Sequence, residues 1–469
     1  MWVNSVQLRA QLGLQNCLLR LRPAIPYLQG MMLLALVGLL LIPLFGQAPI
    51  YQWQTPWNNG QLFSEWVLWG VWYPGTLLSV LLVGRFWCGI LCPLGALSEW
   101  VSRVGAQFRL PGWLRHPIAP ALSFMLVTLW AQTLDVRDDL RSALLLFGVV
   151  FALAVGCGLL FGSSTAVGRR AWCRHLCPIG SVLGVFSRLG VMSLELLRPS
   201  TTAEGYREQG ICPTSIELRT KQSSRHCIKC ARCIKPQSRG GLEVTLRRPG
   251  TEIKGIERHA PCGAELAFIW FAPGLAIAGF IWSVTPLYIQ LRQGLGQWGM
   301  SQHWYGLFAR GPSWLMNQNA SIDQHYLWLD FFSITLFMLG AALVLALLLG
   351  ACSLLGAWAM GRMEQLPLSK RLTLVGYQFA PLAMLCILLG LGSTLFSSLK
   401  SAFGPWLIYL ELGLLLMALL FNLWISARWL LLKKLNHWRL GLSFTAILIG
   451  CLVISLVTLW SIFPAYQPG

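Results

Sequence analysis

Cysteine offers the clearest chemistry in this sequence of 469 residues, which contains 14 cysteines. Two segments repeat at an offset of 85 residues: RFWCGILCPLG at 85–95 and RAWCRHLCPIG at 170–180. Their cysteines are Cys88, Cys92, Cys173 and Cys177. Because Arg, Trp, Leu, Pro and Gly also coincide, we interpret the segments as an internal duplication. A packing turn would not need two cysteines in each copy, so the motif favours metal ligation or redox chemistry over a purely structural role.

The proline of each motif predicts the position of the cysteine before it. Pro disfavours helical backbone at the preceding residue and is favoured at the first position of a helix, so Cys92 and Cys177 are predicted helix N-caps. Helix N-termini and nearby arginines lower a thiol pKa, which predicts thiolates at both positions. Cysteines at i and i+4 also share a helix face. If the repeats pack about a pseudo-two-fold axis, the four thiols converge, either on a shared iron–sulfur cluster or as redox-active dithiols.

A second cysteine group resembles half of a bacterial ferredoxin motif. Cys227, Cys230 and Cys233 form a C-x2-C-x2-C triplet, and Cys212 precedes a proline upstream. In two-cluster ferredoxins the Cys before Pro ligates the cluster of the other triplet. The upstream half lacks a triplet, and the position of a further cysteine, 237, is Gln237. The residues lost would together ligate one cluster, so the remaining four predict one complete [4Fe-4S] site.

Two alternatives remain open for this cysteine group. Four thiolates also suit a structural zinc ion, although zinc sites more often pair two C-x2-C units than use a triplet. Cys262, in the segment APCG, is a rival fourth ligand to Cys212.

The composition excludes a soluble globular protein. Hydrophobic residues make up 55% of the chain and charged residues 11%, against about 25% charged in soluble domains. A transmembrane helix needs about 20 mostly apolar residues. The predicted spans are 29–46, 66–84, 117–134, 142–162, 266–290, 326–352, 372–396, 404–427 and 441–463. The net charge of +19 is explained by basic cytoplasmic loops, so we expect lipid and no nucleic acid as a partner.

Charge distribution predicts the orientation of these nine spans. With the N-terminus inside, 31 of the 36 Lys and Arg residues fall in inner segments, as the positive-inside rule requires. The chain is therefore predicted to lie in a bacterial cytoplasmic (inner) membrane with its N-terminus inside, its C-terminus outside and its iron–sulfur domain in the cytoplasm.

The expected fold class is a polytopic α-helical membrane protein, with about nine transmembrane helices and a small cytoplasmic ferredoxin-like module. The first segment, 1–28, is cytoplasmic, and is either an interfacial amphipathic helix or a polar tail. The later regions are two tandem two-helix repeats (29–198), the ferredoxin-like domain (199–265), a fifth helix with an outer loop (266–325) and a four-helix region of unknown role (326–469).

Other candidate cofactor ligands give weaker signals. No two of the seven histidines pair within one span, so we predict no haem. The remaining cysteines are isolated and are interpreted as small buried hydrophobes. Tryptophans near span ends are typical of the interfacial aromatic belt, with a quinone headgroup pocket as the alternative.

The chain is similar to the membrane-bound polyferredoxins of the NapH, NosR and CcoG type. The resemblance covers roughly residues 29–290, and it rests on the WCxxLCPxG repeats and on the block CPTSIEL…CIKCARC. It implies a membrane electron carrier with cytoplasmic [4Fe-4S] clusters, which serves anaerobic respiratory reductases or the maturation of metalloenzymes. This sequence departs in carrying one ferredoxin site where two are usual, and in adding the four spans of 326–463.

Two functions are compatible with these features. The first is an electron-transfer subunit between a quinol or cytoplasmic donor and a respiratory or metalloenzyme partner, within a multi-subunit complex. The alternative is an assembly factor that reduces a metal or disulfide during biogenesis of a respiratory enzyme. A transporter is a third candidate, but no intramembrane charge network supports it. No P-loop, nucleophile elbow or dinucleotide fingerprint is present, so we expect no catalytic residues of those classes.

Overall fold

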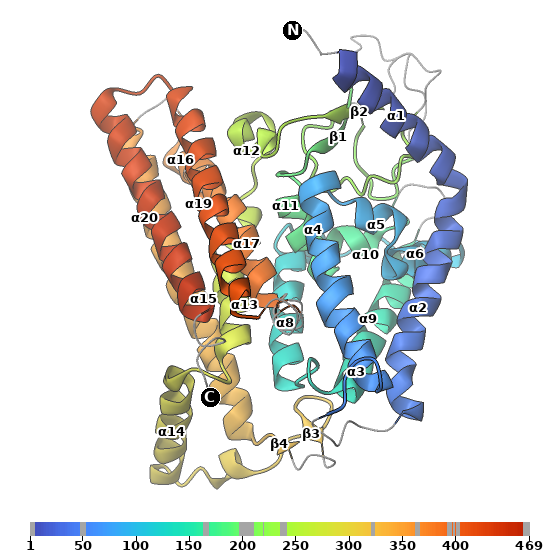
Figure 1. Cartoon of the computed structure of the whole chain (residues 1–469), viewed down its shortest axis with the longest axis vertical. Helices are drawn as coiled ribbons and strands as arrows, with labels where there is room; N and C mark the ends of the chain where they lie inside the picture. Colours follow the sequence, from blue (N-terminus) through green and yellow to red (C-terminus); the bar gives the residue numbers. More distant parts are fainter. Residues whose placement is uncertain are drawn as a thin grey trace. The chain divides into compact units, whose positions relative to one another are not determined.

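The computed structural model of this chain is mostly helical (Figure 1). The described residues are 5–46, 53–162, 168–196, 211–218, 220–234, 242–319, 324–361, 366–391, 396, 399 and 404–462. The chain divides into two compact units. Unit 1 comprises Met1–Gly38, Thr76–Ser123 and Val149–Pro261, and unit 2 comprises Leu39–Gly75, Phe124–Gly148 and Cys262–Gly469.

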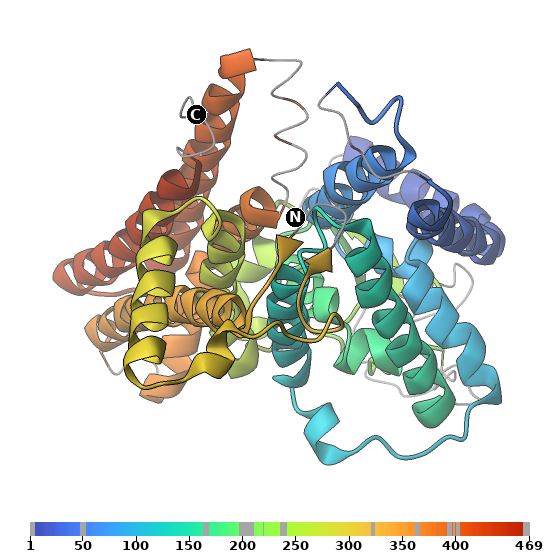
Figure 2. The ribbon, with the colours of Figure 1, turned by 90° about the horizontal axis from the view of Figure 1, so that it is seen from below.

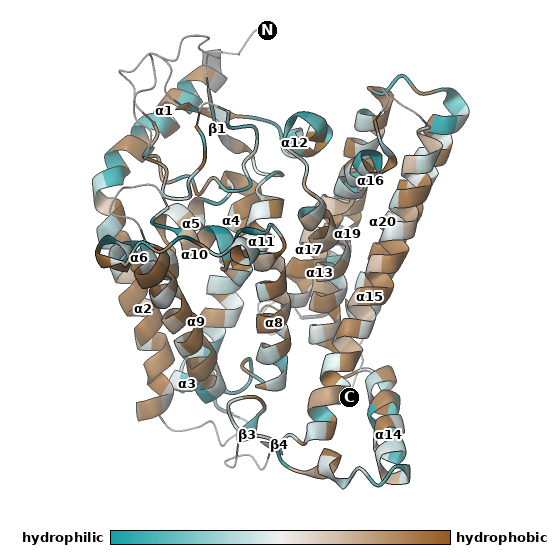
Figure 3. Cartoon of the chain, turned by 180° about the vertical axis from the view of Figure 1, so that it is seen from behind, coloured by the Kyte–Doolittle hydropathy of each residue, from teal (hydrophilic) through white to brown (hydrophobic). Residues whose placement is uncertain are grey.

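Eight helical segments among the described residues are long and apolar enough to cross a membrane. They are Leu8–Ile42, Gly60–Val83, Leu140–Phe161, Gly263–Ile281, Trp328–Ala359, Leu368–Gly390, Leu407–Leu431 and His437–Ile462. The long helices are mostly hydrophobic in Figure 3, whereas α12 (Thr251–Lys254) and α14 (Pro286–Ser301) carry many hydrophilic residues. Each of the eight overlaps a predicted span.

Two of the predicted spans differ from the structure in an informative way. The span 117–134 is α8 (Ala119–Thr133), whose 15 residues give a length of about 22 Å, below the about 30 Å of a hydrocarbon core. The predicted span 266–290 is wrong at its C-terminal end. There, α13 ends at Ile281 and α14 begins at Pro286, because proline favours the first position of a new helix.

Unit 1 holds both cysteine motifs on short helices that follow longer ones. Its elements, some of which continue into unit 2, are α1 (Ser5–Leu21), η1 (Arg22–Ala24), α2 (Ile25–Phe45), α4 (Tyr73–Val83), α5 (Phe86–Ile90), α6 (Pro93–Val101), η3 (Ser102–Val104), α7 (Gly112–Arg115), α8, α9 (Leu140–Phe161), α10 (Ala171–His175), α11 (Pro178–Phe186), β1 (Met192–Leu196), β2 (Leu242–Leu246), α12 and η5 (Ile256–Arg258). The strands pair antiparallel, with Met192 opposite Leu246.

The N-terminal helix packs on the cysteine-rich part of unit 1. The Gln15 side-chain oxygen accepts a hydrogen bond from the Val244 backbone N–H at 3.2 Å. Leu18 and Ile25 are buried in one apolar cluster with Cys227 and Cys233. Helix α1 and the start of α2 therefore cover the apolar core of the small module.

Unit 2 is a helical bundle in which α13 (Gly263–Ile281) contacts α15 and α17, and α15 contacts α20. Its elements are α3 (Gly60–Glu65), the π-helix η2 (Trp66–Trp72), α13, α14, η6 (Tyr305–Phe308), β3 (Gln318–Asn319), β4 (Gln324–His325), α15 (Trp328–Ala359), α16 (Leu368–Gly376), η9 (Tyr377–Phe379), α17 (Ala380–Leu391), η10 (Gly404–Trp406), α19 (Leu407–Leu431) and α20 (His437–Ile462).

The end of the predicted span 117–134 contacts the predicted outer loop that follows the fifth span, in unit 2. The Thr133 hydroxyl donates to the Leu315 carbonyl at 2.9 Å, and the Asn317 N–H donates to the Thr133 carbonyl at 2.9 Å. Figure 2 shows the hairpin β3–β4 beside the turn that follows α8. The end of α8 and the segment before β3 therefore lie on the same side of unit 2.

Candidate functional site

The four cysteines of the predicted ferredoxin site line one small cavity in unit 1. Cys212, Cys227, Cys230 and Cys233 surround it together with apolar side chains that include Leu194 and Leu242. The Thr214 hydroxyl donates to the His226 carbonyl at 3.0 Å, which joins the Cys212 turn to the triplet loop. Residues 201–210 and Gln237, on which the assignment of the lost second site rests, lie outside the described residues.

The backbone around these cysteines has an unusual conformation. Lys229, Ala231 and Ser215 have positive φ angles of 55°, 58° and 53°, a region that costs non-glycine residues roughly 1–3 kcal/mol each. Alternation of right- and left-handed residues turns backbone N–H groups inward, forming the concave nests that hold anions, including iron–sulfur clusters. The donor set and the loop conformation thus fit a cluster with net negative charge.

Electrostatics around the cavity differ from one thiol to the next. Burial alone would raise the pKa of Cys227, but the cations of Lys229 and Lys221 outweigh it and hold that pKa below its ordinary value. Burial raises the pKa of Cys230 to about 11. The thiolate is therefore less favourable at Cys230 than at Cys227. No three His, Cys, Asp or Glu side chains in the described ranges converge closely enough to share a single metal ion.

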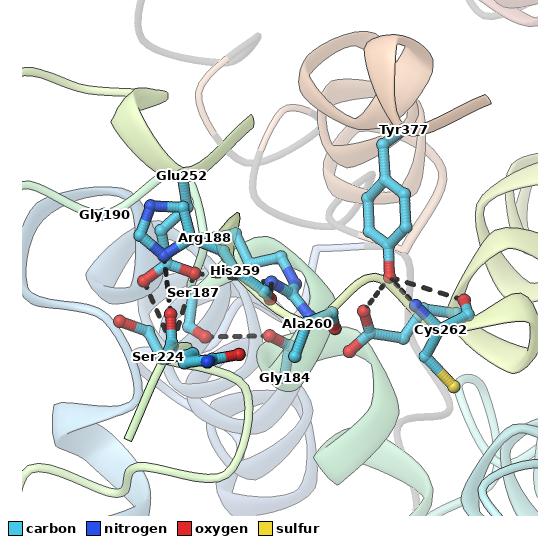
Figure 4. A network of polar contacts seen from close by, with 12 residues as sticks. Gly184, Ser187, Arg188, Gly190, Ser224, Glu252, His259, Ala260, Cys262 and Tyr377 are labelled. Atoms are coloured by element: carbon cyan, nitrogen blue, oxygen red, sulfur yellow. Dashed lines mark hydrogen bonds and ion pairs between the residues drawn. The ribbon is translucent and has the colours of Figure 1, made fainter. Parts of the chain in front are cut away.

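The rival ligand Cys262 has a different environment. It is the N-cap of α13 in unit 2, and it is not among the residues that line the four-cysteine cavity. Its backbone N–H donates to the Tyr377 hydroxyl at 3.1 Å, and Figure 4 shows the Cys262 backbone facing that hydroxyl. Tyr377 in turn donates to Glu265. These contacts hold Cys262 at the start of α13.

The prolines position the C-x3-C-P cysteines as the sequence predicts. Cys92 is the N-cap of α6 and Cys177 the N-cap of α11, with the proline at the first helical position in each case. The Cys92 sulfur accepts from the Gly95 N–H at 3.4 Å. Cys88, however, belongs to the separate helix α5. The two cysteines of a motif therefore flank a turn and do not share one helix face, so that part of the prediction is wrong.

Hydrogen bonds between the two repeats are reciprocal. Arg85 donates to the Cys173 carbonyl at 3.3 Å, and Arg170 donates to the Cys88 carbonyl. Both the donors and the acceptors occupy equivalent positions at the 85-residue offset. Each motif therefore supplies the arginine that holds the other motif's first cysteine, as an approximate two-fold relation between the repeats requires.

Close backbone approaches are reciprocal as well. A Cβ on Gly105, after the first repeat, would lie 2.6 Å from the Gly158 carbonyl of α9. A Cβ on the equivalent Gly190 would lie 2.9 Å from the Val80 carbonyl of α4. Each repeat thus ends against the long helix of the other, which brings the two cysteine turns together.

The predicted lowering of the thiol pKa in these motifs is wrong. Burial, reinforced by the neighbouring thiols, raises the pKa of Cys92 to about 12 and that of Cys177 well above its ordinary value. Burial likewise raises the pKa of Cys173 to about 11, although the Arg170 cation opposes it. The helix N-termini and arginines are present, but desolvation outweighs them. Ligation to a metal is the condition under which buried thiols of this kind ionise.

The two cysteine groups touch through their backbones. A Cβ on Gly89 would lie 2.0 Å from the Ile228 carbonyl and 3.0 Å from the Cys230 nitrogen. At the equivalent position of the second repeat, Arg174 donates to the carbonyls of Thr214 and Ser215. The first repeat thus contacts the triplet loop, and the second repeat binds the Cys212 turn.

This contact predicts a strong effect of Gly89→Ala. The added methyl group would collide with backbone, so we expect the variant to lose about 1–3 kcal/mol of stability and to release the triplet loop from the first repeat. Trypsin digestion of the detergent-solubilised protein should cut within 211–234 faster than in the wild type. The control is Gly112→Ala, where a Cβ meets nothing within 4 Å. Equal digestion rates for the two variants would contradict the proposed docking.

A residue that the sequence analysis missed joins the two groups. Glu99, on α6, is 3% exposed and pairs with Arg170 at 2.6 Å and with Arg232 at 2.5 Å. Burial would raise its pKa, but the two guanidinium groups outweigh burial and hold the pKa below its ordinary value. The sequence feature that could have identified Glu99 is that it is the single carboxylate in the basic segment 85–116.

A second buried carboxylate, Glu252, connects the segment before the triplet to the second repeat. Glu252 pairs with Arg247 at 2.6 Å and with Arg188 at 3.5 Å, and it accepts from the Ser224 N–H at 3.0 Å. Arg188 also donates to the His259 carbonyl at 2.7 Å (Figure 4). This network holds the segment before the triplet against the end of the second repeat.

Comparison with known proteins finds a match to each of the two repeats. A family model described as a 4Fe-4S binding domain matches residues 65–114 and 143–196, and each match contains one C-x3-C-P motif. No solved structure matches the chain.

Three relatives illustrate the resemblance. The ferredoxin-type protein NapH of Escherichia coli is 24% identical over 193 residues, which are 37% of this chain and 66% of NapH. Protein NirI of Paracoccus denitrificans is 27% identical over 227 residues, 43% of this chain and 30% of NirI. The methylamine utilization ferredoxin-type protein MauN of the same organism is 26% identical over 123 residues, 25% of this chain and 44% of MauN. With its duplicated cysteine motif inside the matched domain and its long apolar helices, the chain is similar to the polyferredoxin-type membrane proteins.

Proposed function

We propose that this protein is a membrane-bound electron carrier with two cluster sites in unit 1. One [4Fe-4S] cluster would be held by Cys212, Cys227, Cys230 and Cys233, and a second iron–sulfur cluster by Cys88, Cys92, Cys173 and Cys177. A [4Fe-4S] cluster supplies one-electron transfer when bound. The observation that carries the proposal is the convergence of the four ferredoxin-type cysteines on one cavity, beside the interlocked repeats.

The residues around the two sites would serve this function by holding the clusters and by placing positive charge beside them. The positive φ angles of the loop are of the kind found in anion-binding nests, and Lys221 and Arg232 line the cavity, where their cations favour thiolate ligands. Arg85 and Arg170 fix the two C-x3-C-P turns against one another. We further propose that a quinol or a cytoplasmic donor and a partner protein exchange electrons with these sites, within a larger complex in the bacterial inner membrane.

The test is spectroscopic. Anaerobically purified protein, titrated with dithionite, should give two electron paramagnetic resonance signals, with about eight iron atoms and matching acid-labile sulfide per chain if both sites are [4Fe-4S]. About four iron atoms per chain with one signal would mean that the C-x3-C-P cysteines hold no cluster and act as redox dithiols. Protein that retains zinc and no iron after anaerobic purification would refute the proposal.

The second candidate function, an assembly factor, is favoured by one feature. Motif cysteines on short helices beside a membrane span could deliver electrons to a metal or a disulfide of a folding enzyme. Deletion of the gene separates the two functions. Loss of a respiratory enzyme's activity with its cofactors intact supports electron transfer, whereas accumulation of a cofactor-deficient enzyme supports assembly.

We also propose nine crossings, with the N-terminus inside and the C-terminus outside. Although α8 is short, it begins after the first C-x3-C-P motif and ends where Thr133 contacts Leu315 of a predicted outer loop, which supports a ninth crossing. A C-terminal alkaline phosphatase fusion should therefore be active, and a C-terminal green fluorescent protein fusion dark. A fluorescent fusion without phosphatase activity would contradict this topology.

A further inference from the structure

We propose that Glu99 is a shared counter-charge for the two four-cysteine sites, so that this one carboxylate sets the reduction potentials of both. The inference rests on the proposed function, since it requires both clusters. Glu99 is a positioning residue that acts through two arginines.

The contacts of Glu99 lead to one site on each side. Its Oε2 atom binds Arg170 Nε at 2.6 Å, and Arg170 also donates to the carbonyl of the motif cysteine Cys88. Its Oε1 atom binds Arg232 at 2.5 Å, and Arg232 lies between Cys230 and Cys233 and lines the ferredoxin-type cavity. The two oxygens of one carboxylate thus serve two cluster sites.

Electrostatic interactions of Glu99 and its partner Arg170 also lead to both sites. Arg170 acts on the thiols of Cys173 and Cys230, and Glu99 itself acts on Cys173. Because Glu99 is buried and ionised, its charge is screened far less than that of a surface carboxylate. The duplication does not provide an equivalent, since the matching position of the second repeat is Gly184.

The expected effects have opposite signs for the two halves of the ion pair. Reduction adds negative charge to a cluster, so removal of the Glu99 charge favours the reduced state. At a separation of about 10 Å and an effective dielectric constant of about 20, one unit charge changes such an equilibrium roughly tenfold. The variant Glu99→Gln should therefore raise both potentials, by about 59 mV for a tenfold change in a one-electron couple. The variant Arg232→Gln should lower the potential of the ferredoxin-type site.

The experiment is a redox titration of the full-length protein in lipid nanodiscs, monitored by electron paramagnetic resonance. Glu252→Gln is the matched control, because Glu252 is also a buried carboxylate between two arginines. It should leave the signal of the C-x3-C-P site unmoved. Simple damage to the fold would not shift potentials in opposite directions in Glu99→Gln and Arg232→Gln, whereas a change of charge does.

The remaining outcomes are decisive. If Glu99→Gln shifts one signal or neither, the shared role is refuted. If Glu99→Gln loses its iron, Glu99→Asp decides: restored iron with both potentials near their wild-type values supports the inference, and continued loss refutes it. Wild-type protein that lacks either cluster would instead overturn the proposed function before any variant is compared.

Discussion

The Cys230→Ser variant is expected to lose the ferredoxin-type signal completely and to bind about four fewer iron atoms per chain than the wild type. Cys230 lines the four-cysteine cavity, and the backbone around it adopts left-handed conformations at Lys229 and Ala231. A small domain with little core depends on its metal for folding. Residues 211–234 should therefore become sensitive to protease in the same variant.

The control for this variant is Cys17→Ser. Cys17 is exposed on α1, so the expectation that all the isolated cysteines are buried is wrong for this one. It lies outside the cavity lining, and its replacement should leave both the iron content and the signal intact. Iron and acid-labile sulfide analysis, with electron paramagnetic resonance of the reduced protein, provides the measurement. Equal iron in Cys230→Ser and wild type would refute the ligand assignment.

Cys88→Ser and Cys173→Ser should each abolish the same second signal and leave the ferredoxin-type signal in place. The two residues lie in different repeats, yet each has its carbonyl held by the other repeat's arginine. A cluster shared between the repeats predicts identical losses, because removal of one ligand from either repeat opens the same site.

A neighbouring thiol outside the motif is the control for this pair. Cys157 of α9 is buried in one apolar cluster with Cys173, so Cys157→Ser perturbs the same core without removing a motif cysteine. It should keep both signals. If Cys88→Ser and Cys173→Ser instead retain full iron but fail to transfer electrons to a dye acceptor, the motif cysteines act as redox dithiols.

Local physics made several features of this protein predictable. Each of the eight apolar helices overlaps a predicted span, because a membrane helix needs only length and low polarity. The N-cap positions of Cys92 and Cys177 followed from the proline after each. Span ends were less predictable: α14 begins at Pro286 inside a run that the apolar pattern assigned to the preceding span.

Interactions between distant residues were not predictable in the same way. The packing of α1 on β2 through Gln15 and Val244 joins residues more than 200 positions apart. The pKa of Cys177 was predicted with the wrong sign, since its helix N-terminus is visible in the sequence while its burial is not. Glu99 was overlooked because an isolated glutamate has no motif around it.

The sequence by itself determined the class of the protein, the duplication and the eight cysteines with the chemistry to hold clusters. These features depend on composition, spacing and the backbone restrictions of proline, and all of them act within a few residues. Only the tertiary structure decided that Arg85 and Arg170 cross between the repeats, that Gly89 lies against the triplet loop and that Glu99 links the two sites. Those contacts depend on how segments 70 to 140 residues apart pack, and burial and partner charges exist only once that packing has formed.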